Sequence, residues 1–382
     1  MTETTRRLEC NAADETLFVA FELGSTKWVL ASTTRGTSQR PRLRQIVAGD
    51  LAALQREVLT AKVRFGLRVD APVRSVYEAG RDGFWLDRWL HAQAITNIVV
   101  DSSSIEVNRR ARRMKTDRLD AGKLLQLLLR WAHGEPRVWS VVRVPSPEEE
   151  AARQLTREIT TVRVDRTQVR NRIQGLLATQ GIRCELTRPF PARLAELQTG
   201  DGRPLAAAWR DRLAREWAHL QAIETRLATL CTARAAAIAA GADRVAQVAQ
   251  QLCQLRGVGE TSAALYSAEL FGTRTFANGR QLGALTGLVP VPYRSDQRVH
   301  DQGISKAGRA ELRRVSIQVA WCWLRWQPDS ALAEWFRRRF GAAGGRSRRI
   351  GIVAVARKLV IALWRFVAHG EVPAGAQLKP TT

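Results

Sequence analysis

The stretch Leu17-Phe-Val-Ala-Phe-Glu-Leu-Gly-Ser-Thr-Lys-Trp-Val-Leu-Ala-Ser32 holds two short apolar runs on either side of a small turn. The first run ends in an acid, Glu22, and the turn is Gly24-Ser-Thr. Two apolar runs joined by a short turn that contains glycine are typical of a β-hairpin. We therefore expect two antiparallel strands over 17–22 and 27–32, with the acid at the end of the first strand.

Further strand and helix patterns follow this hairpin. Apolar runs predict strands, and patterning with a helical period predicts the helices between them. The expected strands are 73–78, 96–101 and 137–144, and the expected helices are 84–93 and about 116–131. Strands that alternate with helices are typical of an α/β domain, which we place at residues 1–146.

The composition indicates a polyanionic partner. The chain has 382 residues and a formal net charge of +24, from 60 basic and 36 acidic side chains. Hydrophobic residues make up 45% of it, which excludes a disordered chain. All but seven of the basic residues are arginines, whose planar guanidinium suits phosphate oxygens. Half of the excess charge lies in residues 251–382, so we expect DNA or RNA to bind there.

Cysteine usage and hydropathy indicate the compartment. The five cysteines are scattered and never paired as Cys-x-x-Cys, and the five histidines are scattered as well. This pattern argues against a disulfide framework and against a zinc site. Residues 1–9 lack the apolar run of a signal peptide, and the apolar stretch 350–367 carries three basic residues. We expect a cytoplasmic protein with no membrane partner.

Two further segments differ in composition from the first. Residues 147–250 show long helical patterning that is interrupted near Gly181 and again at 189–204. Apolar residues recur there at mixed steps of three and four, which is typical of a coiled coil or of a packed helical hairpin. A dimerising arm and an intramolecular hairpin are equally good interpretations. Residues 251–382 are expected to be mostly helical around a polar loop at 289–303.

Four acids of the first segment form a candidate metal site: Glu22, Glu78, Asp117 and Asp120. The first two end expected strands, and the last two lie three residues apart on one helix face. Carboxylates on rigid elements suit Mg²⁺, and a metal pair stabilises both the attacking and the leaving oxygen in phosphodiester chemistry. The alternative is structural, with the aspartates beginning an amphipathic helix and the glutamates ending ordinary strands. Asp82 and Asp101 compete for membership of this site.

The sequence Leu255-Arg-Gly-Val-Gly259 separates two apolar helical stretches. This pattern is typical of the turn in a helix-hairpin-helix element, in which Gly257 and Gly259 would let backbone N–H groups approach a phosphate. A plain turn between two helices, with no ligand, is the equal alternative. The positive charge of the surrounding segment favours contact with DNA.

The polar loop holds a serine, Ser295, among basic residues. The cations on either side are Arg294, Arg298, Lys306 and Arg309. A serine in such surroundings is a candidate nucleophile toward a phosphodiester, because the cations would neutralise the developing charge. The alternative is a polar loop without catalytic function, since serine often stands beside arginine in loops. A separate basic cluster, also expected to contact nucleic acid, consists of Arg109, Arg110, Arg112 and Arg113.

Six motifs follow one another along the chain: Ala20-Phe-Glu-Leu23, Val76-Tyr-Glu-Ala-Gly80, Lys115-Thr-Asp-Arg-Leu-Asp-Ala121, Leu255-Arg-Gly-Val-Gly259, Gly287-Leu-Val-Pro290 and Gly303-Ile-Ser-Lys-Ala-Gly308. In this order they resemble the DEDD transposases of the insertion sequence 110 family, also called bridge-RNA-guided recombinases. The resemblance covers nearly the whole chain. Its most specific part is the third motif followed much later by the sixth.

The resemblance implies a fold in three parts. These are an N-terminal RuvC-like domain of the RNase H fold, a coiled-coil linker and a C-terminal transposase domain. On this chain they correspond to 1–146, 147–250 and 251–382. It also implies that members act as a dimer of dimers, in which the acids and the serine of one active site come from different protomers.

The resemblance also implies a mechanism. Carried over motif by motif, the four acids Glu22, Glu78, Asp117 and Asp120 hold Mg²⁺. Ser295 attacks the DNA backbone and forms a covalent phosphoserine link. A structured guide RNA from the element pairs with both donor and target DNA.

Two positions depart from the family pattern. Glu22 stands where most members have aspartate, so its carboxylate lies one methylene farther from the strand. Asp296 follows Ser295 where glycine is usual, which places a negative charge beside the nucleophile. Ser305 is the reserve candidate for the nucleophile, although it is expected to cap a helix. Two other functions are considered: a RuvC-like junction resolvase that uses the acids and water, and a nucleic-acid-binding protein without catalysis.

Overall fold

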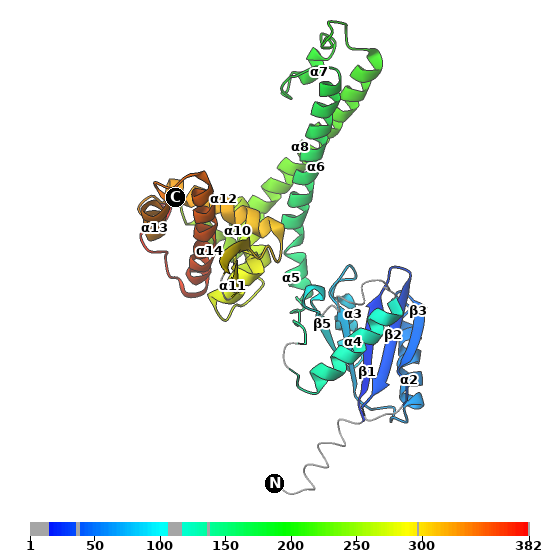
Figure 1. Ribbon diagram of the computed structural model, residues 1–382. Helices are drawn as coiled ribbons and strands as arrows, with labels where there is room; N and C mark the ends of the chain where they lie inside the picture. The colour runs from blue at the N-terminus through cyan, green and yellow to red at the C-terminus, as the bar shows by residue number, and fades with distance from the viewer. Residues whose placement is uncertain (1–14, 36–38, 106–116, 136–137, 296–297, 381–382) are drawn as a thin grey trace. The chain divides into compact units, whose positions relative to one another are not determined.

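The computed structural model describes residues 15–35, 39–105, 117–135, 138–295 and 298–380. The chain divides into two compact units, Met1–Pro145 and Ser146–Thr382 (Figure 1). Each unit is described by itself below. A further boundary near residue 250, inside the second unit, stays a prediction.

The first unit contains a five-stranded sheet with the strand order β3-β2-β1-β4-β5. Its strands are β1 Leu17–Leu23, β2 Lys27–Thr34, β3 Arg42–Val47, β4 Val73–Glu78 and β5 Ile95–Val100. Strands β1, β2 and β3 are antiparallel neighbours, whereas β4 pairs parallel to β1 and β5 parallel to β4. The predicted hairpin over residues 17–32 is therefore confirmed, and it forms the middle of the sheet.

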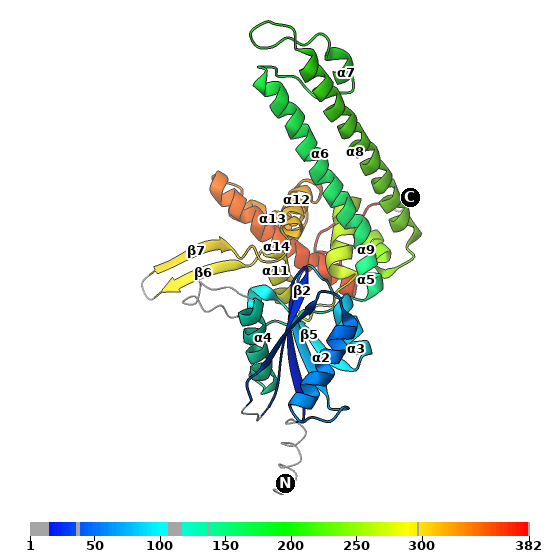
Figure 2. The same ribbon diagram turned by 90° about the vertical axis from the view of Figure 1, so that its right-hand side faces the viewer.

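Helices cover both faces of this sheet (Figure 2). They are α2 Leu51–Arg64, α3 Trp85–Ala92 and α4 Asp117–Ala132, with a 3-10 turn, η1, at Ser102–Ser104. Side chains alternate along β1, because successive residues of a strand point to opposite faces. Leu17, Val19 and Phe21 pack with α2 and α3, whereas Phe18 and Ala20 pack with α4. This α/β arrangement is compatible with the RuvC-like domain that the family resemblance implies.

The predicted strand over 137–144 is wrong. Its described residues contribute one isolated bridge, between Val141 and Val100, instead of a ladder. A single bridge joins Val141 to the edge strand β5, and the chain then leaves for the second unit.

The second unit begins with a helical hairpin. Its elements are α5 Pro147–Ala151, α6 Gln154–Thr179, α7 Phe190–Arg193 and α8 Ala207–Ala240. Ser146 and Glu149 form a capping box that fixes the start of α5. Helices α6 and α8 lie side by side in both views, and their facing apolar residues, such as Ile173 and Leu220, are fully buried (Figures 1 and 2). Of the two interpretations of this segment, the intramolecular hairpin is present within the chain, and a dimerising role stays a prediction.

The rest of the second unit is mainly helical. Its elements are α9 Arg244–Cys253, α10 Glu260–Tyr266, the π-helix η3 Ser267–Phe271, α11 Gly279–Thr286, β6 Pro290–Ser295, β7 Arg298–Ile304, α12 Ala310–Trp326, α13 Ala331–Phe340 and α14 Gly345–His369. Its core contains Tyr266, Trp323 and Leu363, all fully buried. The polar loop predicted at 289–303 is instead a two-stranded ribbon. Within the described part of the chain, no helix is long and apolar enough to span a membrane.

Candidate functional site

Glu22 and Glu78 are brought together by the pairing of β1 with β4. Phe21 is in register with Tyr77, so the two glutamates follow at the same level on neighbouring parallel strands. Ala20 and Val76, two residues earlier, both pack on the α4 side of the sheet. Because side chains alternate along a strand, both glutamates belong to this α4 face. The predicted adjacency of two strand-end acids is therefore present.

The two glutamates line one pocket at this edge of the sheet, with a volume of about 190 Å³. Tyr77 and Asp82 line it as well. The Tyr77 hydroxyl donates a hydrogen bond to the Gly83 carbonyl, 3.1 Å away, and so fixes the loop after β4. Burial raises the pKa of Tyr77 well above its ordinary value, so this hydroxyl keeps its proton at neutral pH. Sequence reasoning did not single out Tyr77, although it directly precedes Glu78 in the quoted motif.

The two predicted aspartates lie on α4. Asp117 is the first residue of that helix, and its side chain lies outside the described residues. Asp120 is half-buried, and its Oδ2 is fully buried without a hydrogen-bond partner. A buried carboxylate oxygen is destabilising when no cation or donor satisfies it. Asp120 is thus the described acid that most needs a ligand.

The donor chemistry fits a divalent cation. Carboxylate oxygens from rigid strands and a helix are the ligands that Mg²⁺ prefers. Within the described residues, however, no three His, Cys, Asp or Glu side chains lie close enough together to hold a metal ion. Of the competing acids, Asp82 lies in the same pocket, whereas Asp101 accepts a hydrogen bond of 2.9 Å from the Ser103 N–H and so caps η1. Asp101 therefore has a structural function.

Ser295 ends strand β6 and pairs with Arg298 on β7. The two residues between them, 296 and 297, lie outside the described part, as do the side chains of residues 292–302. Ser295 therefore stands at the tip of the ribbon, which projects from the helical part of the second unit (Figure 2). The side chains of the predicted Arg294 and Arg298 are among those not described.

The base of this ribbon is fixed by two glycines from two separate motifs. Gly287 and Gly308 both have left-handed backbones, with φ of +66° and +68°. A Cβ on Gly287 would overlap the carbonyl oxygen of Ala307, and one on Gly308 would overlap that of Leu285. The Lys306 N–H also donates to the Gly287 carbonyl at 3.2 Å. The two motifs thus form one backbone clamp beneath the ribbon.

Replacing Gly308 by alanine should open this clamp. We expect a loss of unfolding free energy of about 2 kcal/mol or more, because a strained backbone costs roughly 1–2 kcal/mol and the overlap with Leu285 adds to it. Gly303 is a matched control in the same ribbon, since its φ is +87° but nothing lies within 4 Å of its Cβ position. Gly303→Ala should therefore lose only the part of the unfolding free energy that comes from backbone strain. Urea unfolding measures both free energies of unfolding, and equal losses in the two variants would contradict the clamp.

Arg309 is half-buried and forms ion pairs within the second unit. Its guanidinium pairs with Glu269 and, at 2.8 Å, with Glu311, and Arg157 of α6 binds Glu269 at 2.9 Å. Burial by itself would raise the pKa of Glu269, but the hydrogen bonds and charges of Arg157 and Arg309 hold it below its ordinary value. Glu269 thus joins α6 to the start of α12. The signal in the sequence was a lone acid within the apolar run 264–271.

The remaining predicted binding residues stand in different places. Gly257 has a φ of +83° and lies against the backbone of Cys322 and Trp323, so close packing already accounts for it. Gly259 is the N-cap of α10 with open space before its Cβ position. Lys306 is exposed. Contact of these residues and of Arg309 with nucleic acid stays a prediction. The four arginines at 109, 110, 112 and 113 lie outside the described residues.

The chain is similar in sequence to a known protein family and to several known proteins. A family model described as "Transposase IS116/IS110/IS902 family" matches residues 249–334, the part that holds both the clamp and the ribbon. The protein y4rJ of Sinorhizobium fredii, which is named as a transposase, is 40% identical over 376 residues, 95% of this chain and 94% of that protein. A second protein of this organism named as a transposase, y4qE, is 25% identical over 371 residues, 91% of this chain and 87% of its own length. The transposase for insertion sequence element IS1328 of Yersinia enterocolitica is 32% identical over 128 residues, 33% of this chain and 37% of that protein.

Proposed function

Because this chain belongs to the IS116/IS110/IS902 family of transposases, we propose that it cuts and rejoins the DNA strands of an insertion sequence through Ser295 and a Mg²⁺-binding acidic site. The acids of that site are Glu22, Glu78, Asp117 and Asp120. The observation that carries the proposal is the pairing of β1 with β4, which sets Glu22 and Glu78 at the same level of one pocket.

In the proposed reaction the Ser295 Oγ attacks the phosphorus of a DNA phosphodiester. An Oγ–P bond forms while the bond from phosphorus to the leaving sugar oxygen breaks, so the number of phosphoester bonds is unchanged. The serine proton passes to a base, and the leaving sugar oxygen takes up a proton. In rejoining, a sugar hydroxyl of the second strand attacks the same phosphorus and Ser295 leaves. Exchange therefore needs no nucleotide cofactor.

The acids would act by holding a Mg²⁺ ion beside the reacting phosphate. Bound Mg²⁺ supplies Lewis-acid stabilisation of the attacking and leaving oxygens. Glu22 and Glu78 would hold it from the strand ends, and Asp120 would contribute its otherwise unsatisfied Oδ2 from α4. The position of Ser295 at a ribbon tip supports its access to a DNA strand.

We further propose that specificity comes from a structured guide RNA that pairs with donor and target DNA, and that the chain works as a dimer of dimers. Both parts rest on the family resemblance. The net charge supports the nucleic-acid partners, since residues 151–382 hold 36 basic and 17 acidic side chains. Residues 1–150, which hold the acids, are closer to balance, with 24 basic and 19 acidic side chains.

The second candidate is a RuvC-like junction resolvase or nuclease, which would use the acids and water without a covalent intermediate. The observation that favours it is that the pocket of Glu22 and Glu78 lies wholly within the first unit. It gives no function to the clamp and ribbon, which lie within the segment that the family model matches.

The test is strand exchange by the full chain. The purified protein is given Mg²⁺, the RNA that copurifies with it, and DNA carrying the element ends and a target. We expect joined donor and target strands, and sequencing of the RNA should reveal stretches complementary to both. Cleavage without joining would favour the resolvase. Binding without cleavage would overturn both proposed enzymatic functions. An RNA without complementarity to either DNA would remove the guide from the proposal.

A further inference from the structure

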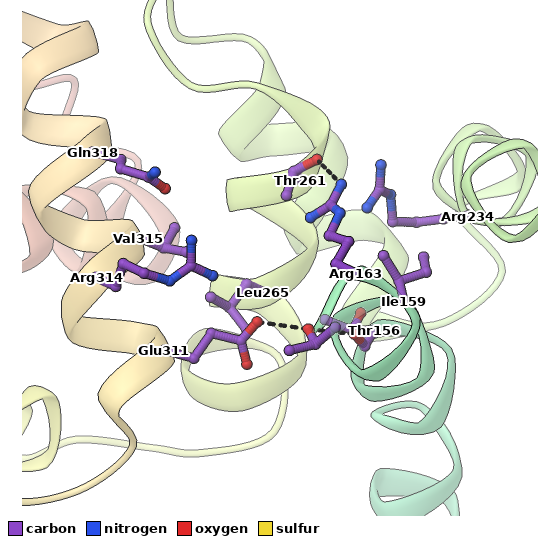
Figure 3. A pocket seen from close by; sticks show the side chains of 11 residues that line it. Thr156, Ile159, Arg163, Arg234, Thr261, Leu265, Glu311, Arg314, Val315 and Gln318 are labelled. Atoms are coloured by element: carbon purple, nitrogen blue, oxygen red, sulfur yellow. Dashed lines mark hydrogen bonds between the residues drawn. The ribbon is translucent and has the colours of Figure 1, made fainter. Parts of the chain in front are cut away.

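A small pocket lies where the helical hairpin meets the rest of the second unit (Figure 3). Its walls come from α6, α8, α10 and α12, and its volume is about 50 Å³. Its lining includes the buried apolar side chains of Ile159, Leu265 and Val315. Three arginines line the same small space: Arg163 from α6, Arg234 from α8 and Arg314 from α12.

Arg234 is the unusual member of this group. Only 8% of its surface is exposed, and its Nε is buried without a hydrogen-bond partner. Among the described residues, no carboxylate forms an ion pair with it. Burying a guanidinium that lacks a counter-charge is strongly unfavourable. An anion bound in this pocket would supply the counter-charge that Arg234 lacks.

The other polar groups that line the pocket supply little negative charge to offset its arginines. The Arg163 Nη2 donates to the neutral Thr261 hydroxyl at 3.3 Å, and Arg314 is exposed at the mouth. One carboxylate, Glu311, lines the pocket, but it already accepts hydrogen bonds from Thr160 at 2.6 Å and from Arg309 at 2.8 Å. In Figure 3 a dashed hydrogen bond ends on the Glu311 carboxylate, and none joins Glu311 to Arg234.

We propose that this pocket binds a phosphate oxyanion. Guanidinium groups bind phosphate through paired N–H donors, and Arg163, Arg234 and Arg314 offer such donors from three helices. The volume is several times what a single water needs, so a small tetrahedral anion fits and a bulky ligand does not. The phosphate comes either from a nucleic-acid backbone at the exposed mouth or from free inorganic phosphate. Its binding would tie α6 and α8 to α10 and α12. This site lies within the second unit and does not depend on the proposed strand chemistry.

The test is thermal unfolding of the full chain in inorganic phosphate against chloride at equal ionic strength. Phosphate should raise the Tm of the wild type by several degrees. Arg234→Gln should remove this shift without lowering the Tm in chloride, because the buried charge it deletes has no partner there. Arg215→Gln is the matched control, since it removes the same charge from an exposed position of the same helix, and it should keep the shift.

Two outcomes would overturn the site. One is a wild-type Tm that responds to phosphate no more than to chloride. The other is a phosphate shift that survives in Arg234→Gln. If Arg234→Gln does not fold, Arg163→Gln removes a less buried guanidinium from the same pocket and should lose the shift equally.

A second measurement identifies the source of the phosphate. If it belongs to a nucleic-acid backbone, Arg234→Gln should weaken binding of a DNA duplex about 10-fold and reduce the slope of log K against log salt by about 1, whereas Arg215→Gln should do neither. If it is free phosphate, both variants should bind the duplex like the wild type, and Arg234→Gln alone should lose the Tm shift. Binding assays need no catalysis, so they separate this inference from the proposed function.

Discussion

Ser295→Ala should abolish strand exchange and every covalent protein–DNA species. The Ser295 Oγ is the atom proposed to attack phosphorus, and alanine has no atom to replace it. Loss of a nucleophile removes most of the catalysis that depends on it, so we expect exchange to fall by more than about 10³-fold. DNA affinity should remain within about 2-fold, because phosphate contacts and net charge carry nonspecific binding. Denaturing gels of reactions with labelled DNA measure both the adduct and the joined product.

Ser305→Ala is the matched control for this substitution. Ser305 is the other serine considered as nucleophile, and it lies exposed beside the ribbon base, where its backbone N–H donates to the Val289 carbonyl at 2.9 Å. Alanine keeps that bond, so Ser305→Ala should exchange strands like the wild type. An adduct that survives Ser295→Ala but disappears in Ser305→Ala would move the nucleophile to residue 305.

Glu22→Gln and Glu78→Gln should each reduce DNA cleavage by about 10²–10³-fold while DNA binding is kept. Glutamine has nearly the same size as glutamate but lacks its charge, so the pocket keeps its shape and loses its hold on a divalent cation. An electrostatic stabiliser of a transition state is typically worth this much in rate. Because acids repel DNA unless a cation intervenes, binding in the absence of metal should be unchanged or tighter in both variants. Cleavage at a series of Mg²⁺ concentrations is the measurement.

Glu15→Gln provides the control for charge. Glu15 is an exposed glutamate just before β1, and the change is chemically the same. It should leave cleavage at the wild-type rate. If Glu22→Gln and Glu78→Gln also cleave at that rate, the acidic pocket takes no part in the reaction, and the metal assignment is wrong.

The local elements of the first unit were largely predictable. The hairpin over 17–32 and the strand 73–78 show clear apolar runs bounded by turns or acids, and both are present. Strand β3 and helix α2 were not predicted. Strand β3, Arg42–Val47, is an edge strand with mostly exposed or half-buried side chains, so its sequence lacks an apolar run. Helix α2 had a usable signal in Asp50 as its N-cap.

The ribbon of β6 and β7 was not predicted, for a different reason. Pro290 and Pro292 suggest a loop, because proline cannot donate a ladder hydrogen bond. A two-stranded ribbon tolerates them, since each strand has one edge without a partner. The glycine clamp beneath it joins residues about 20 positions apart, and spacing alone does not reveal such a contact.

For the candidate site, the strand-end positions of two acids were predictable and their arrangement was not. Glu22 and Glu78 could be identified as strand-end acids, but only the parallel pairing of β1 with β4 makes them neighbours. Contact of Arg309 with nucleic acid stays a prediction, and its pairing with Glu269, 40 residues away, was not predicted. Arg234 gave one signal, a lone charge in the alanine-rich end of α8. Long-range contacts decide these cases, and periodicity describes only local ones.

The most direct test of the central claim is mass spectrometry of the protein–DNA adduct trapped in a strand-exchange reaction. After nuclease and protease digestion, the peptide that contains Ser295 should carry the mass of a nucleotide, and fragmentation should place it on that serine. The peptide should be unmodified in Glu22→Gln reactions, because the acids are needed for attack. Joined DNA products together with a nucleotide on another residue, or on no residue, would contradict the account.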